Sequence, residues 1–211
     1  MTVRLYGADY SVYVRIARLV LIEKGVDHEL VPVDLFSPEG IPAWYRDLHP
    51  FGRIPAFERD GFRLFETSAI ARYVDEAFPG PALQPAKARA RAVMNQIIGL
   101  LDAYAYRSMV WDVYVERVSK PRAGHMSDEN RIAAALPVAR TCIETLSRLK
   151  AAGPWLLGEE LTLADLHAAP IFAYFVRAPE GSAMLEGNPA MSAWWREIAA
   201  RPSFAATEPT S

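Results

Sequence analysis

Apolar residues in the first part of the chain follow two different periods. They alternate singly in VRLYG, residues 3–7, and then recur every three or four positions over residues 16–21, before Gly25. Side chains repeat every two residues along a strand and every 3.6 residues along a helix. The pattern therefore predicts a strand followed by a helix that ends at Gly25, a residue type favoured just beyond helix ends.

Three further strands and a second helix are predicted before residue 80. Residues 28–35 (HELVPVDL) indicate one strand, residues 56–65 indicate two strands joined at Asp60-Gly61, and residues 69–77 repeat at helical spacing. The order β, α, β, irregular segment, β, β, α is typical of a small α/β layer. We expect its first two strands to be parallel and its last two to form a hairpin.

The sequence changes character at Pro79-Gly80-Pro81. Beyond this break the strand signals stop, and apolar residues repeat at helical spacing over residues 93–104 and 132–149. Two more helices are expected to begin near Thr162 and near Met191. The second half of the chain is therefore predicted to be helical.

These patterns predict two domains, so that the fold class is α/β plus all-α. The predicted parts are an α/β domain at residues 1–78, a linker at residues 79–85 and a helical domain at residues 86–211. Thr162 and Asp165 have the spacing of a capping box, which assigns Asp165 to the start of a helix. Residues 205–211 are expected to form a polar tail.

Composition narrows the classes of partner. The 211 residues are 51% hydrophobic and carry 23 basic and 25 acidic side chains, for a formal net charge of -2. Because no basic face is evident, neither nucleic acid nor anionic lipid is an expected partner. No apolar run approaches the ~20 residues of a membrane span, and the first strand begins too early to leave room for a signal peptide. We therefore expect a cytoplasmic protein with a small molecule or another protein as partner.

The single cysteine and the four histidines limit the chemistry. Cys142 permits no internal disulfide, no cysteine-pair redox chemistry and no cysteine metal cluster. Its place on an apolar helical face indicates ordinary packing. The histidines lack metal-ligand spacing, so no metal site is predicted. Any reaction must use another side chain or a thiol that a ligand supplies.

The stretch HPFGRIPAF, residues 49–57, places a proline immediately before a predicted strand. Pro55 cannot donate a backbone hydrogen bond, and an X-Pro bond is cis in only about 5–6% of cases in folded proteins. A trans bond would make this segment an ordinary turn. A cis bond would instead turn the N–H and C=O of Ile54 outward, where an extended peptide could pair with them.

Two predicted helix starts carry hydroxyl side chains. Glu66, Thr67 and Ser68 stand where the second helix begins, and Ser11 stands at the first βα junction. Free N–H groups and the positive end of the helix dipole attract anions at such positions. Each hydroxyl can equally cap its own helix, so the residues alone leave both interpretations open. The Ser11 hydroxyl is no base near neutral pH, but it can donate a hydrogen bond to an anion such as a thiolate.

Six ordered blocks along nearly the whole chain resemble the cytosolic glutathione transferase family, and its phi-like, serine-type members most closely. The blocks are YGADYS, EKGVDHELVPVDL, HPFGRIPAF, LFETSAIARYVDE, WLLGEELTLADLHAAPIF and AWWREIAARPSF. The resemblance implies a thioredoxin-like N-terminal domain and an all-helical C-terminal domain, usually paired as a homodimer. It also implies glutathione as co-substrate and a small electrophile as second substrate.

The resemblance further assigns roles to individual residues. It implies that Pro55 is cis and that Ile54 pairs with the cysteinyl backbone of glutathione. It implies that Glu66 and Thr67 hold the γ-glutamyl end. Ser11 becomes the thiol-activating hydroxyl by its position in the motif. Tyr10 is the second candidate, because tyrosine-type relatives use a phenol for the same task.

One part of the phi-like pattern is missing. Phi-like members usually carry a His-Lys pair before the HPF-like motif to hold the glycyl carboxylate, whereas residues 36–48 read FSPEGIPAWYRDL. Arg53 stands where the family usually has Gln. Our hypothesis is that the Arg53 guanidinium takes over this contact, for which its fork is well shaped. The alternative is an exposed surface arginine.

The second substrate is expected in an apolar cleft between the domains, bordered by the run YAYRSMVWDVYV of residues 104–115. The candidate pocket residues are Tyr10, Tyr104 and Trp111. Tyr104 and Trp111 share one helical face with Ser108 and Val115, so contacts in the core or in a dimer are the alternative.

The predicted function is a glutathione transferase that stabilises the glutathione thiolate for attack on a small, hydrophobic electrophile. Substitution, conjugate addition, peroxide reduction and isomerisation could all use one activated thiol. The alternative is a catalytically weak or inactive glutathione transferase-like binding or scaffold protein, favoured by the missing carboxylate anchor. A dithiol oxidoreductase is disfavoured because its cysteines are absent.

Overall fold

The computed structural model describes residues 2–210 and divides the chain into two compact units. Unit 1 takes the described residues of Met1–Gln84 and Arg201–Ser211, and unit 2 is Pro85–Ala200. The helical domain expected at residues 86–211 therefore differs from unit 2 at its C-terminal end, because the segment from Arg201 onward belongs with unit 1. Met1 and Ser211, which the predicted domains include, lie outside the described residues.

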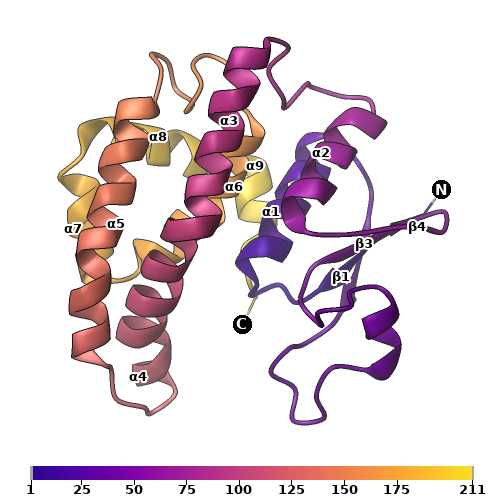
Figure 1. Cartoon of the computed structure of the whole chain (residues 1–211), viewed down its shortest axis with the longest axis horizontal. Helices are drawn as coiled ribbons and strands as arrows, with labels where there is room; N and C mark the ends of the chain where they lie inside the picture. Colours follow the sequence, from indigo (N-terminus) through magenta and orange to yellow (C-terminus); the bar gives the residue numbers. More distant parts are fainter. Residues whose placement is uncertain (1, 211) are drawn as a thin grey trace. The chain divides into compact units, whose positions relative to one another are not determined.

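A four-stranded mixed sheet forms the centre of unit 1 (Figure 1). Its strands, in the spatial order β2-β1-β3-β4, are β1 (Val3–Gly7), β2 (Glu29–Pro32), β3 (Ala56–Arg59) and β4 (Phe62–Phe65). β1 and β2 run parallel, while β3 is antiparallel to both β1 and β4. The predicted crossover and hairpin are thereby confirmed. Leu5, which is fully buried, stands opposite Leu30 on β2 and Phe57 on β3.

The helices of unit 1 pack beside this sheet. Helix α1 (Val12–Glu23) packs on β1 and on helix α2 (Thr67–Ala77), and a short 3-10 helix, η1 (Ala43–Asp47), lies in the predicted irregular segment. At the end of β1 the strand passes so close to α1 that a Cβ on Gly7 would lie 2.4 Å from Val14 Cγ2. This close approach sets where the chain turns from β1 into α1.

The C-terminal segment does not form the expected polar tail. It begins with helix α9 (Pro202–Ala206), which packs on α1, and Thr207 is fully buried. The cause is the buried guanidinium of Arg15 on α1, which lies 4.1 Å from the centre of the Phe204 ring and donates to the Phe204 carbonyl at 2.9 Å. A buried cation requires polar partners. Thr207 and Glu208 therefore act as polar partners of a buried cation, while Glu208 and Thr210 are themselves exposed.

Unit 2 consists of helices and loops. Its helices are α3 (Ala88–Leu100), η2 (Leu101–Ser119), α4 (Lys120–Arg122), α5 (Glu129–Leu149), α6 (Leu163–Phe175), α7 (Pro179–Glu186) and α8 (Pro189–Ala199). α3, η2 and α4 follow one another without a break, and η2 is π-helical, so that the Lys120 N–H donates to Val115 O, five residues back. The helix predicted at residues 93–104 is part of this longer run.

Helix α6 forms the core of unit 2. Each of its residues is buried, and it packs on α3, η2 and α8. The predicted capping box at its start is present, with Thr162 N–H donating to Asp165 Oδ2 at 2.9 Å. Asp165 Oδ1 also accepts from the Leu156 N–H at 2.7 Å and from Trp194 Nε1 at 2.9 Å. Its capping role is confirmed, and it also connects three separate segments.

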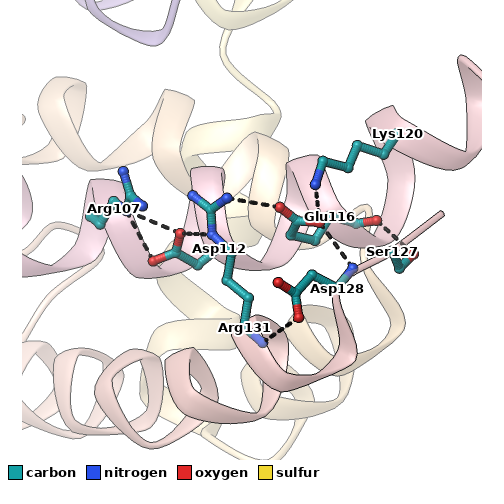
Figure 2. A network of polar contacts seen from close by, with 7 residues as sticks. All are labelled: Arg107, Asp112, Glu116, Lys120, Ser127, Asp128 and Arg131. Carbon is teal, nitrogen blue, oxygen red and sulfur yellow. Dashed lines mark hydrogen bonds and ion pairs between the residues drawn. The ribbon is translucent and has the colours of Figure 1, made fainter. Parts of the chain in front are cut away.

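An ionic network joins η2 to α5 (Figure 2). The fully buried Glu116 accepts from Lys120 Nζ at 2.7 Å, from Arg131 Nη1 at 2.9 Å and from the Asp128 N–H at 3.1 Å. Arg131 also donates to Asp112 Oδ1 at 2.6 Å. Burial raises the pKa of Glu116, but these hydrogen bonds and charges outweigh burial and hold the pKa below its ordinary value.

Among the described residues, no helix is long and apolar enough to cross a membrane.

Candidate active site

Ser11 stands at the junction of β1 and α1 as the residue that caps the helix. Its N–H donates to the Ala8 carbonyl at 3.1 Å, which closes a turn, and its Oγ accepts from the Val14 N–H at 3.4 Å. This capping contact uses only a lone pair of the oxygen, so the O–H proton is still able to donate to a ligand. The capping and the anion-binding interpretations of Ser11 are therefore compatible.

The Tyr10 hydroxyl is engaged within unit 1. It donates to Asp34 Oδ1 at 2.7 Å and accepts from the Leu35 N–H at 3.3 Å. Burial, reinforced by the bond to Asp34, raises the pKa of Tyr10 well above its ordinary value. A phenol that already donates to a carboxylate is a poor partner for a thiolate, which favours Ser11 over Tyr10.

The Ile54-Pro55 bond is cis, as the resemblance implies and in contrast to the trans alternative. Just before it, the hydroxyl of the buried Tyr45 donates to the Arg53 carbonyl at 2.7 Å, which fixes the segment to η1. Within residues 2–210, no group forms a hydrogen bond with the Ile54 backbone. That backbone is therefore open to an extended ligand.

Helix α2 begins without a side-chain cap. The preceding residue, Glu66, has φ +71°, a conformation that non-glycine residues rarely adopt and that is often found at ligand sites. Its carbonyl accepts from the N–H groups of Ala69 and Ile70 at 3.0 Å. The N–H groups of Thr67 and Ser68 have no partner in the described part of the chain. Such an open helix start attracts a carboxylate.

Arg53 and Glu66 bring opposite charges to this region. Both side chains are exposed, and neither has an ion-pair partner among residues 2–210. Burial lowers the pKa of the nearby His49, while the Glu66 carboxylate raises it and the Arg53 cation lowers it further. Both charges therefore lie near the His49 ring, where they are free to meet a ligand that carries both signs.

Arg46 on η1 is a second cation that sequence reasoning missed. Gly52 has φ +59°, and a Cβ there would lie 3.0 Å from Ile41 Cδ1 and 3.4 Å from Arg46 Nη1. The Arg46 guanidinium therefore packs over Gly52, next to Arg53 in the chain. No period or motif in the sequence marks this position, because it depends on how η1 folds onto the Gly52 turn.

Tyr104 and Trp111 both lie on η2 in unit 2. Tyr104 is 60% exposed and borders a cavity of about 300 Å³, together with Arg107 and Val138 among others. Trp111 is half-buried and does not line this cavity. The two side chains therefore do not share this cavity, and their role toward an electrophile stays a prediction.

Cys142 and His167 are both buried in unit 2. Cys142 is buried, and burial raises the pKa of its thiol to about 11, so that little thiolate forms near neutral pH. His167 contacts Asp102 through Nε2 at 2.8 Å. In the described residues, no group of three or more His, Cys, Asp or Glu side chains could hold a metal ion. The open polar groups of unit 1 are therefore the candidate site.

Unit 1 is a thioredoxin-like α/β domain, and it carries an open backbone beside a cis-proline. Comparison with protein families places both parts of the chain. The family model "Glutathione S-transferase, N-terminal domain" matches residues 5–82, and "Glutathione S-transferase, C-terminal domain" matches residues 120–202. With the relatives described next, this shows that the chain belongs to the glutathione S-transferase family.

Named relatives match over nearly the full length. Glutathione S-transferase F9 of Arabidopsis thaliana is 30% identical over 210 residues, which cover 98% of this chain and 96% of the relative. Glutathione transferase F7 from Populus trichocarpa has 28% identity and a TM-score of 0.86, with 98% and 97% of the two chains covered. A glutathione S-transferase from Methylobacillus flagellatus, solved with GSH bound, has 25% identity and a TM-score of 0.79, with 99% and 100% covered. The resemblance to phi-like members is confirmed.

Proposed function

We propose that the protein is a glutathione transferase that binds reduced glutathione on unit 1 and presents its thiolate to a small, hydrophobic electrophile. The observation that carries the proposal is the set of unsatisfied polar groups within unit 1. The Ile54 backbone is open beside a cis-proline, the start of α2 is uncapped, and the Ser11 hydroxyl keeps a free proton. Each group matches one part of the tripeptide. Membership of the family, and a relative solved with GSH bound, support this assignment.

The γ-glutamyl end of glutathione is assigned to the start of α2. Its α-carboxylate matches the open N–H groups of Thr67 and Ser68, and the positive end of the helix dipole stabilises the same charge. Its ammonium group matches the exposed Glu66 carboxylate. Ile54 supplies an N–H and a C=O to the cysteinyl backbone, in the manner of an added strand.

The glycyl carboxylate is assigned to Arg53, with Arg46 as a second cation close by. Residues 36–42 contain no basic side chain, so the anchor that is usual in phi-like members has no equivalent there. Arg53 is exposed and follows the Gly52 turn on which Arg46 packs. A guanidinium can contact a carboxylate through two parallel hydrogen bonds, so one or both arginines can replace the missing pair.

Ser11 is assigned to the sulfur. When the thiol loses its proton to solvent, the Ser11 O–H donates to the thiolate, and the sulfur then forms the new bond to the electrophilic carbon. In a substitution the leaving group departs with the electron pair of the broken bond; in a conjugate addition the resulting carbanion takes a proton from water. The protein supplies position and electrostatic stabilisation, and the nucleophile belongs to glutathione.

The energies are sufficient for this role. Lowering a thiol pKa of about 8.5 by two units requires about 2.7 kcal/mol, at about 1.36 kcal/mol per unit. A hydrogen bond to a charged group contributes about 1.5 to 3 kcal/mol, and the start of α1 adds about 0.3 to 1 kcal/mol through the helix dipole. A single hydroxyl at a helix start can therefore make most of the bound glutathione a thiolate near neutral pH.

Replacement of Ser11 tests the function. We expect Ser11→Ala to lower kcat/KM for glutathione with 1-chloro-2,4-dinitrobenzene about ten- to hundredfold, because one charge-assisted hydrogen bond is lost. Retention on glutathione resin should change little. Ser11→Thr keeps the hydroxyl and should retain most of the activity, and Tyr10→Phe, which leaves the Ser11 hydroxyl in place, should lower turnover less than Ser11→Ala. Equal turnover by wild type and Ser11→Ala contradicts the role of Ser11; absence of both retention and turnover in the wild type indicates a binding or scaffold protein.

Replacement of Arg53 tests the glycyl anchor. We expect Arg53→Ala to weaken glutathione binding about three- to twentyfold, the range for loss of a partly exposed charge-assisted hydrogen bond. The glycyl monoethyl ester of glutathione lacks the charged carboxylate, so its affinity should fall little in the variant. Arg63→Ala, which removes another exposed arginine of unit 1 on β4, is the matched control. Unchanged affinity of Arg53→Ala for glutathione means that Arg53 is not the anchor.

We also infer a second copy of the chain as partner and a cytoplasmic location. Large apolar side chains that are exposed in unit 1 support self-association, and they are Phe36, Trp44, Phe51 and Phe62. Gel filtration with light scattering measures the association directly. A monomer at micromolar concentration contradicts the proposed homodimer.

A further inference from the structure

The C-terminal strap, residues 201–210, is fastened along the whole length of α1. Arg201 forms two hydrogen bonds with the Glu23 carboxylate, at 2.7 and 2.6 Å, near the end of the helix. Arg18 Nη2 donates to the Ala206 carbonyl at 3.3 Å in the middle. At the far end, the strap reaches the turn that precedes α1 and contacts Asp9. Thr210, the last described residue, therefore lies beside the turn that carries Ser11.

The strap is anchored in the middle by a buried charge. Arg15 is 1% exposed, and it bonds to Thr207 Oγ1 at 3.3 Å and to Glu208 at 2.5 Å, in addition to its contact with the Phe204 carbonyl. Removal of these partners would leave a buried cation without full compensation, which is costly. The strap is therefore an integral part of unit 1, and its final residues are held close to Asp9.

Asp9 receives two hydrogen bonds from one residue of the strap. Thr210 donates its N–H to Asp9 Oδ2 at 3.1 Å and its hydroxyl to the same oxygen at 2.7 Å. These bonds lower the pKa of Asp9, with smaller help from the Arg18 cation, so the group is a carboxylate near neutral pH. We call this pair of residues the Asp9–Thr210 clasp.

The clasp acts on the turn of residues 8–11 from one side. The Ser11 N–H closes this turn by donating to the Ala8 carbonyl at 3.1 Å. Tyr10, the next residue after Asp9, is held from a different part of unit 1 through Asp34 at 2.7 Å. The two central residues of the turn are thus fixed by two separate segments, and Ser11 follows them directly.

We propose that the Asp9–Thr210 clasp is a positioning device for Ser11, so that the C-terminal strap sets the geometry of thiol activation. The inference rests on the proposed role of Ser11 and adds Asp9 and Thr210 as positioning residues. Neither residue needs to touch glutathione. Their effect is to keep the turn in one conformation, because a hydroxyl that moves by about 1 Å loses much of its contribution to a charged transition state.

The clasp also controls a negative charge. A free Asp9 carboxylate two residues before Ser11 would disfavour a second anion at the sulfur position, since like charges raise each other's pKa values. The two Thr210 donors and Arg18 partly neutralise this carboxylate and hold it toward the strap. Opening the clasp therefore removes a restraint on the turn and frees an anion near the thiolate.

Three substitutions at one exposed position remove the donors stepwise. Thr210→Ser keeps both donors, Thr210→Val removes the hydroxyl, and Thr210→Pro removes the hydroxyl and the N–H together. All three retain the Arg15 partners at Phe204, Thr207 and Glu208, so unit 1 should remain folded. Thr141→Val is the control, because it removes an exposed threonine hydroxyl from α5 of unit 2.

Two measurements on the full chain test the clasp. We expect kcat/KM with glutathione and 1-chloro-2,4-dinitrobenzene to fall about threefold in Thr210→Val and about tenfold in Thr210→Pro, mainly through kcat. Thr210→Ser should keep the wild-type value. Hydrogen exchange of the Ser11 amide in the ligand-free protein should quicken in the same order, with the melting temperature nearly unchanged.

The outcomes separate this inference from the proposed function. Faster Ser11 exchange together with graded loss of kcat supports the clasp. If Ser11→Ala impairs turnover but Thr210→Pro changes neither turnover nor exchange, the clasp is overturned and the role of Ser11 stands. If exchange quickens in Thr210→Pro while turnover equals that of Thr141→Val, the clasp is structural only and the inference is wrong. If Ser11→Ala itself has no effect on turnover, the proposed function fails, whatever the exchange shows.

Discussion

Asp165 offers the sharpest test of how unit 2 is held together. The residue is fully buried, and its two oxygens serve three segments: the start of α6, the loop at Leu156 and the Trp194 ring of α8. We expect Asp165→Ala to destabilise the protein by about 3 to 5 kcal/mol, the range for removing one partner from a buried charged network.

The magnitude follows from the groups left behind. Three N–H donors would lose their acceptor, on Leu156, Thr162 and Trp194, and a buried unsatisfied donor costs about 1 to 3 kcal/mol. The Thr162 hydroxyl, which donates to Asp165 at 2.8 Å, is able to rotate and find another acceptor. Part of the loss is offset, because burial of this carboxylate is itself unfavourable and raises its pKa, against the effect of the hydrogen bonds.

Urea unfolding followed by circular dichroism and by tryptophan fluorescence measures this loss. Asp165→Asn keeps one oxygen for Leu156 and Trp194 but turns an amide NH2 toward the Thr162 N–H, so we expect about half of the effect of alanine. Asp128→Ala is the matched control, since Asp128 is an exposed cap with a single capping bond to Arg131, and its loss should cost about 1 kcal/mol. If Asp165→Ala costs no more than Asp128→Ala, the assignment of Asp165 as a three-way connection is wrong.

Three further predictions concern other parts of the chain. Glu116→Gln should lower the free energy of unfolding by about 2 kcal/mol, because a neutral amide cannot compensate the charges of Lys120 and Arg131. Chemical denaturation measures this change, and a loss below about 0.5 kcal/mol would contradict the role of the buried charge. Burial raises the pKa of Glu23, but its hydrogen bonds to Arg201 and Ser203 outweigh burial and leave the pKa lowered. The stabilisation by Glu23 should therefore be complete at any pH above the ordinary pKa of glutamate and should be lost as the pH falls through the lowered pKa. The free energies of unfolding of wild type and Glu23→Gln, measured as a function of pH, should therefore converge at low pH and differ at neutral pH. Phe51→Asp should shift the proposed dimer toward monomer in gel filtration, because a 72% exposed aromatic side chain would become charged; an unchanged elution volume argues against Phe51 in the contact.

The sheet and its topology could be predicted because each strand has its own local signal. Alternation in residues 3–7 and the Asp60-Gly61 turn between two apolar runs are sufficient to indicate β1 and the β3–β4 hairpin. The bounds of the long helical run of α3, η2 and α4 were harder to predict, because residues 105–122 place aromatic and charged side chains on several faces and show no clean helical period. Its continuity comes from contacts with α5 and α6, which no local pattern encodes.

The candidate site was predictable where a motif reports backbone geometry. The helix starts after Ser11 and Glu66 follow from short local stretches. The cis bond at Pro55 was implied by the family resemblance, because the residues alone left a trans turn open. Contacts between residues far apart in sequence could not be predicted. The engagement of Tyr10 with Asp34 is one example, and the burial of Arg15 against residues 204–208 is another, because single arginines and polar tails are usually exposed.

The strap makes unit 1 discontinuous in sequence, and this bears on how the chain is synthesised. Since domains generally fold as they emerge from the ribosome, the sheet can form early, but Arg15 must wait for residues 204–208, which are synthesised only after all of unit 2. An incomplete chain therefore carries an uncompensated cation in its first helix. A chain cut before residue 204 should for this reason form a less stable unit 1, even though its sheet and both long helices would be present.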